Sequence, residues 1–211
     1  MFKKLLTAAL ITSMLILPVN SAGPANPQGA SAPGQVQDYL PGDVPAETDA
    51  AESMSPALHA LLLAMLNHDV KAFDFRDQAL TWEGLYNMLS LYGQMDSRSI
   101  TEQGELFLPE ETVLDYAAVL DMDLDALGTP PAAIRDRLNY DNVSRSYVVV
   151  CGADNLAQIQ VENLAVSGDS YVLTGALVYE AENEVLVRFQ ATLQSQDNMF
   201  GYAVSALAIT D

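Results

Sequence analysis

Three aspartates at alternate positions form the cluster that most suggests metal chemistry. Asp121, Asp123 and Asp125 match the opening of a calcium-binding loop, where carboxylates at the first, third and fifth positions supply oxygen ligands. The same loop requires glycine at its sixth position and glutamate at its twelfth, but these positions hold Ala126 and Ala132. We therefore interpret the aspartates as an acidic helix end or loop, and we predict no metal site and no cofactor.

The two histidines are the other residues that suit a metal ion. His59 and His68 lie nine residues apart in the sequence. On a continuous helix this spacing places two side chains about 180° apart, because each residue turns the helix by about 100°. They cannot share a metal ion without a distant third ligand. We interpret them as ordinary side chains on the faces of a helix.

Acid–base and nucleophilic chemistry receive little support from motifs. Glycosidases need two facing carboxylates, and among 28 acidic residues some pair will look suitable by chance. Glu83 beside Trp82 is the best single candidate, since an aromatic ring could hold a sugar, but a first-turn acid on a core-anchored helix explains it better. No serine-hydrolase elbow or glycine-rich phosphate loop occurs. The lone cysteine, Cys151, ends an apolar run and is interpreted as a small buried hydrophobe.

Aromatic side chains provide the remaining candidate site. Trp82 and Tyr86 fall on one predicted helix, and Tyr140 lies near the predicted sheet. Core packing accounts for such residues, yet a concave binding surface between helices and sheet would use the same ones. We take Trp82, Tyr86 and Tyr140 as the candidate binding surface and name no catalytic residue.

The first 22 residues have the layout of a cleavable secretory signal. Lys3 and Lys4 precede a mostly apolar run at 5–17, which Pro18 ends before a group of small residues. The run is too short to cross a bilayer as a helix, which needs roughly 20 apolar residues. Residues 1–22 are therefore predicted to be a signal peptide. We expect a secreted or extracytoplasmic protein that is soluble, with no membrane insertion after cleavage.

Composition then divides the rest of the chain. Residues 23–52 are rich in Pro, Gly and Ala without apolar periodicity, which predicts a disordered linker. Residues 53–211 are predicted to form a single domain, long enough for one substantial core. The net charge of −19 becomes more negative when a signal with two lysines and no acid is removed. Such a charge repels nucleic acid and anionic lipid, so the expected partner is an unknown protein or envelope component.

Hydrophobic periodicity predicts helices first and strands afterwards. Apolar residues at helical spacing predict helices that start at Ser55, Thr81 and Pro109, and a short one that follows Pro130 and Pro131. From Tyr147 onward the apolar period changes to two, with short turns between runs, as in an antiparallel meander. The predicted fold class is α+β: N-terminal helices, extending to about residue 140, packed on one face of a C-terminal meander sheet of four or five strands.

These observations favour an exported, non-enzymatic binding or interaction module whose partner is unknown. Two alternatives stay open, namely an extracellular glycan-active hydrolase that uses paired carboxylates, and a carrier of a small ligand between helices and sheet. The hydrolase requires a cleft with two facing carboxylates about 5 to 9.5 Å apart. The carrier requires an apolar pocket of roughly 300 Å³ or more.

Overall fold

The computed structural model describes residues 46–124, 129–152 and 156–210. The predicted signal peptide, the predicted linker as far as residue 45, and Asp125 lie outside the described residues. In chain order the elements are α1 (Ala46–His68), α2 (Gln78–Tyr92), the 3₁₀ turn η1 (Gly93–Met95), β1 (Ile100–Glu102), β2 (Glu105–Pro109), α3 (Glu110–Val119), α5 (Ala132–Arg135), β3 (Leu138–Asp141), β4 (Ser146–Val150), β5 (Ala157–Ser167), β6 (Ser170–Tyr179), β7 (Glu184–Ser195) and β8 (Tyr202–Ile209).

Helix α1 begins at Ala46, which corrects the predicted start at Ser55 and adds residues 46–52 of the predicted linker to the helix. This segment is rich in alanine and glutamate, which favour helix. Pro56 lies inside the helix, although proline removes one backbone hydrogen bond there. The Ser55 hydroxyl donates to the Ala51 carbonyl oxygen at 2.8 Å, one turn earlier. The Ser-Pro pair therefore falls within a continuous helix and does not start one.

Helix α2 begins before the predicted start at Thr81 because Asp77 caps it. The Asp77 carboxylate accepts hydrogen bonds from the backbone N–H groups of Ala79 at 2.9 Å and Leu80 at 3.2 Å. This satisfies donors that the first helical turn otherwise leaves without partners. The predicted end of the helix is confirmed, since Gly93 is its C-cap.

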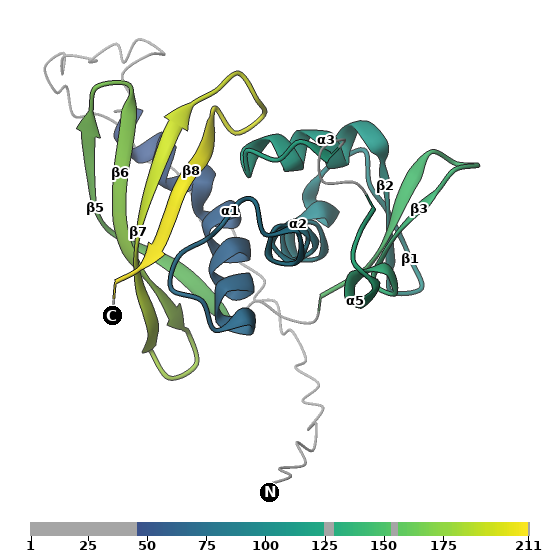
Figure 1. The fold of residues 1–211 in the computed structure, drawn as a ribbon, viewed down its shortest axis with the longest axis horizontal. Helices are drawn as coiled ribbons and strands as arrows, with labels where there is room; N and C mark the ends of the chain where they lie inside the picture. Colours follow the sequence, from purple (N-terminus) through teal and green to yellow (C-terminus); the bar gives the residue numbers. More distant parts are fainter. Residues whose placement is uncertain (1–45, 125–128, 153–155, 211) are drawn as a thin grey trace, which may run out of the picture. The chain divides into compact units, whose positions relative to one another are not determined.

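The whole circumference of α2 is buried. Every residue from Leu80 to Ser90 is buried, and a helix of this kind must have neighbours on all sides. Helix α1 approaches one side so closely that a Cβ atom on Gly84 would lie 2.8 Å from Leu61 Cδ2. In Figure 1, α2 is seen end-on between α1 and the sheet that contains β2. Two sheet layers flank these helices: one packs on α1, and the other contacts α2.

The first layer is the predicted meander, which the structure confirms along with the α+β class. Strands β5, β6, β7 and β8 form one antiparallel sheet in that order. Helix α1 contacts β5, β6 and β8, and α3 contacts β8. On β7 the buried residues are Val187, Phe189, Ala191 and Leu193. They alternate with residues that face away from the helices, as expected for a sheet with one covered face.

The second layer is a sheet that the sequence did not predict. Strands β1, β2, β4 and β3 form it in the order β1-β2-β4-β3, and all its pairs are antiparallel. We call it the N-terminal sheet. The apolar run at Tyr147 therefore belongs to this sheet and not to the meander, and the region before residue 140 is not only helical. Helix α2 contacts β4, and α3 contacts β2 and β4.

The two edges of the meander differ. The segment that connects α1 to α2 lies along β8: Phe73 N–H donates to the Leu207 oxygen at 2.9 Å, and Ile209 N–H donates to the Lys71 oxygen at 2.8 Å. Edge strand β5 instead carries a register shift between Val161 and Asn163, an irregularity that weakens its capacity to pair with another strand. Within the described residues, no helix is long and apolar enough to cross a membrane.

Gly175, on β6 beside this register shift, permits a close approach of the β5 backbone. A Cβ atom there would collide with the Gln160 backbone oxygen and lie 3.1 Å from Phe189 Cζ. We therefore expect Gly175→Ala to lower the free energy of unfolding by about 1–3 kcal/mol, as overpacking does. Urea-induced unfolding measures this change.

Gly84→Ala is the matched control. Its added methyl group comes too close only to the end of the Leu61 side chain, while Phe73 lies at ordinary contact distance. A side-chain end yields more easily than backbone, and alanine is about 1 kcal/mol better than glycine within a helix. We expect the free energy of unfolding to fall clearly less for Gly84→Ala than for Gly175→Ala. A loss at Gly84 equal to or above that at Gly175 would contradict this explanation.

Candidate interaction surface

The structure places the predicted aromatic candidates mainly inside the protein. Trp82 is 1% exposed and Tyr86 is 7% exposed. One face of the Tyr86 ring is occupied by the Arg137 guanidinium, whose carbon lies 4.4 Å from the ring centroid. Tyr140 is half-buried on β3, where its ring packs against Tyr147 with centroids 4.9 Å apart. Trp82 and Tyr86 therefore present no free ring face for a ligand.

Glu83, the best single candidate for a catalytic acid in the sequence, contacts residues from several elements. Its carboxylate accepts hydrogen bonds from Asn67 Nδ2 at 3.2 Å and from Arg137 Nη2 at 3.3 Å. His68 Nε2 lies 4.0 Å from the same carboxylate. The end of α1, the start of α2 and the chain before β3 thus meet at one nearly buried acid. Removing one partner of such a pair leaves a charge uncompensated, so this cluster is best explained as structural.

His59 is separated from His68 and is almost fully buried, at 1% exposed. Its Nδ1 atom is hydrogen-bonded to the Tyr92 hydroxyl at 2.6 Å. Burial lowers the pKa of His59 from 6.5 to about 4, because a charged imidazolium loses its hydration inside the protein. At neutral pH His59 is therefore uncharged.

The remaining candidates from the sequence, Asp121, Asp123 and Cys151, do not form part of a metal-binding cluster in the described residues. Asp121 has a positive φ of 52° directly after the C-cap of α3, a conformation that aspartate tolerates at helix ends. Asp123 follows it, and Asp125 lies outside the described residues. Within the described parts of the chain, no three His, Cys, Asp or Glu side chains are grouped to hold a metal. Cys151 is half-buried and packs against the core.

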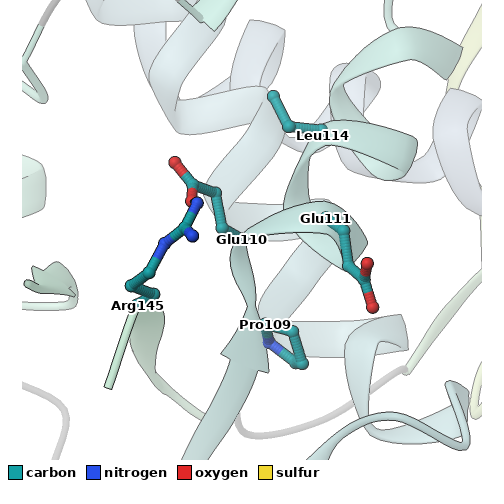
Figure 2. Close-up of a pocket in the computed structure, with 5 residues that line it drawn as sticks. All are labelled: Pro109, Glu110, Glu111, Leu114 and Arg145. Carbon is teal, nitrogen blue, oxygen red and sulfur yellow. The ribbon is translucent and has the colours of Figure 1, made fainter. Parts of the chain in front are cut away.

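A depression with a volume of about 460 Å³ lies at the start of α3. Figure 2 shows the Glu110 and Arg145 side chains turned toward one another, with the Glu111 carboxylate directed away from them. Arg145 Nη2 donates to Glu110 Oε2 at 2.8 Å. Because the two acids diverge and one is paired with arginine, this depression lacks the facing carboxylates of a glycosidase.

Another two carboxylates, those of Asp96 and Asp115, are joined by an arginine. The Arg98 side chain donates two hydrogen bonds to Asp96, at 2.8 and 3.0 Å, and one to Asp115 at 2.8 Å. The hydrogen bond from Arg98 lowers the pKa of Asp96 below its usual value. A carboxyl group with a lowered pKa stays ionised and is poorly suited to donate a proton at neutral pH. This cluster links the turn after α2 to α3.

The most distinctive surface is the face of the N-terminal sheet turned away from α2 and α3. Register places Ile100 opposite Phe107, and Phe107 opposite Val148, so three adjacent strands contribute one apolar row. The next row contains Glu102, Glu105 and Val150. We call this the open face. Its residues are Ile100, Glu102, Glu105, Phe107, Asn139, Val148 and Val150.

Burial alternates along β2 as this assignment requires. Leu106 and Leu108 are fully buried on the inner face of β2, and successive residues of a strand point to opposite faces. On the open face, Ile100 is 59% exposed and Val150 is 39% exposed. The described helices pack on the inner face, and in Figure 1 α2 and α3 are drawn on one side of this sheet. Phe107 and Val148 are half-buried, so the apolar row is partly exposed to another molecule.

Two features explain why the sequence did not reveal this surface. The hairpin β1–β2 is joined by Gln103 and Gly104, both with positive φ (53° and 87°), which is the conformation of a two-residue type I′ turn. The Gln-Gly pair was a local signal for a hairpin, but Glu102 and Glu105 flank it and β1 is only three residues long. The row also depends on the pairing of β2 with β4, which short-range patterns do not report.

Comparison with known proteins adds no assignment. No protein-family model matches the chain, and no curated protein matches it significantly. The arguments for function therefore come from the geometry and chemistry of this chain. A shared fold would in any case not by itself establish a function.

The buried His59 predicts a pH dependence of stability. Its folded-state pKa of about 4 lies below its ordinary value of 6.5, so the unfolded chain binds the proton first as pH falls. The contribution of uncharged His59 to the free energy of unfolding is therefore fully present above pH 6.5. It is lost between pH 6.5 and 4, at no more than about 1.4 kcal/mol per pH unit. Urea titrations across this range measure the slope.

We expect His59→Gln to reduce this slope, because glutamine keeps a hydrogen-bonding group but has no proton to bind in the range. His68→Gln serves as the control, since His68 is 33% exposed in its side chain. An unchanged slope in His59→Gln, or a larger change in His68→Gln, would contradict the assignment of this pH dependence to His59.

Proposed function

We propose that this protein is an exported interaction module that binds a partner protein through the open face. The observation that carries the proposal is the apolar row of Ile100, Phe107 and Val148, held in register on a sheet face opposite the packed helices. Contiguous apolar patches on a protein surface commonly mark interaction sites. A rigid sheet is also well suited to hold such side chains in fixed positions.

The outer face of the meander provides a comparison within the same molecule. Along β7 that face carries Arg188, Gln190 and Thr192. Arg188 also forms an ion pair with Glu162 on β5. The β7 residues on this face are polar, although the neighbouring strands place Ala165, Val172 and Ala206 in register with Thr192. The row on the open face differs because it joins the larger apolar side chains of Ile100, Phe107 and Val148 across three strands.

Export is proposed from the sequence features of residues 1–22, and it agrees with an acidic protein that carries a net charge of −19. The alternative functions receive less support from the geometry. Arg98 joins Asp96 to Asp115, and Arg145 pairs with Glu110 while the Glu111 carboxylate is directed away, so these acids do not face one another across a cleft. Leu58, Leu62, Leu173 and Leu177, from α1 and β6, are fully buried in the continuous core, where a carrier would need its ligand space.

Site-specific photo-crosslinking tests this proposal. A photoreactive phenylalanine analogue at position 148 is expected to form an adduct with a partner in the protein's native extracellular setting, because Val148 lies in the apolar row. The same analogue at Gln190, on the polar face of the meander, is the matched control. Phe107→Asp, combined with the analogue at position 148, should abolish the adduct. Without an adduct specific to position 148, the proposed function fails.

A further inference from the structure

We infer that the partner presents apolar side chains flanked by lysine or arginine, with the cations placed against Glu102 and Glu105. This inference rests on the proposed function and specifies the chemistry of the partner. It follows from the charges that border the apolar row and from the positions of the arginines in the described structure.

Glu102 and Glu105 lie directly opposite each other across the β1–β2 hairpin. Both residues are exposed. Like charges in directly opposed positions destabilise a strand pair. No ion pair to either carboxylate occurs among the described residues. A cation supplied by a partner would relieve this repulsion, and it would lie beside Val150, which shares their row.

The arginines of the described structure are largely committed elsewhere. Arg98, Arg137, Arg145 and Arg188 each form an ion pair with a different acid or acid pair. The two carboxylates at the edge of the open face therefore have no arginine partner among the described residues. In the described fold, the open face places the apolar row directly beside these two opposed acids at the β1–β2 hairpin.

Charge also argues against a second copy of this chain as the occupant. Two copies that joined their open faces would bring two Glu102–Glu105 pairs together. Each chain carries a net charge of −19, and like-charged surfaces repel association. The same repulsion disfavours anionic lipid. A basic partner instead gains both apolar burial and favourable electrostatics.

The size of the row limits the shape of the partner. Neighbouring strands lie about 4.8 Å apart, so the row across three strands is about 10 Å long. Two successive turns of a helix rise about 11 Å, which matches this length. An amphipathic segment with two or three apolar residues and flanking lysine or arginine fits the surface.

The test uses a random short-peptide phage library selected on the immobilised full-length protein. Peptides that also bind the Phe107→Asp variant are removed, so that selection reports the open face. We expect the enriched peptides to combine apolar residues with lysine or arginine. Sequences without an excess of basic residues, or no enrichment at all, would overturn the inference.

Synthetic versions of the enriched peptides are then measured against two double variants of equal charge change. Glu102→Gln with Glu105→Gln removes the opposed acids, and affinity should fall about three- to tenfold, as for two exposed ion pairs. Glu182→Gln with Glu184→Gln, at the β6–β7 turn, should change it less than twofold. Equal effects of the two double variants would contradict specific contacts at Glu102 and Glu105.

Two further outcomes separate this inference from the proposed function. Sedimentation that shows a wild-type dimer, dissociated by Phe107→Asp, would identify a second copy as the occupant and overturn the inference. If crosslinking at Val148 finds a partner but the peptides show no basic preference, the proposed function stands and only the partner chemistry fails. If crosslinking finds no partner, the proposed function itself fails.

Discussion

The fold depends on the burial of α2 from every side. Between Leu80 and Ser90 the helix has no exposed residue, so one sheet with helices on a single face could not enclose it. Helix α1, which itself packs on the meander, covers one side of α2, and the N-terminal sheet with α3 covers the other. The surface of α2, with Trp82 fully within the core, thus requires a second sheet in addition to the meander that packs on α1.

This requirement also accounts for the open face. A four-stranded sheet that covers α2 on its inner side has a second side, and on β7 of the meander the corresponding side is polar. In the N-terminal sheet the corresponding positions hold Ile100, Phe107 and Val148. Apolar residues there add little to the stability of the isolated chain, because they remain partly in contact with water. Their presence in register is more readily explained by a partner than by the needs of folding.

The acidic composition has a similar double role. Several acids stabilise the fold through arginine, as where Arg98 joins Asp96 to Asp115. Others, such as Glu102 and Glu105, lie opposed at the edge of the open face. Only the first group contributes to the architecture. The second group makes the surface selective for basic partners, since complementary charge favours the correct partner and disfavours others.

The meander could be predicted from the sequence because each of its strands pairs with the next along the chain, and the alternation from Val187 to Leu193 is regular. The end of α2 at Gly93 could also be predicted, because a glycine C-cap is a signal from residues adjacent in the sequence. The N-terminal sheet could not be predicted in this way, because β1 has three residues and β2 pairs with the distant β4. The aromatic candidates failed as a surface for a related reason, since periodicity shows that Trp82 and Tyr86 share a helix but not that this helix is enclosed.

The central claim is that Phe107 belongs to a free surface while its neighbour Leu106 belongs to the core. The direct measurement is the free energy of unfolding of Leu106→Ala and Phe107→Ala in the full chain. Leu106 is fully buried, so its removal should cost about 2–5 kcal/mol, whereas Phe107→Ala should cost about 1 kcal/mol or less. A loss at Phe107 equal to or greater than that at Leu106 would show that the open face is covered within the chain itself and would contradict the account.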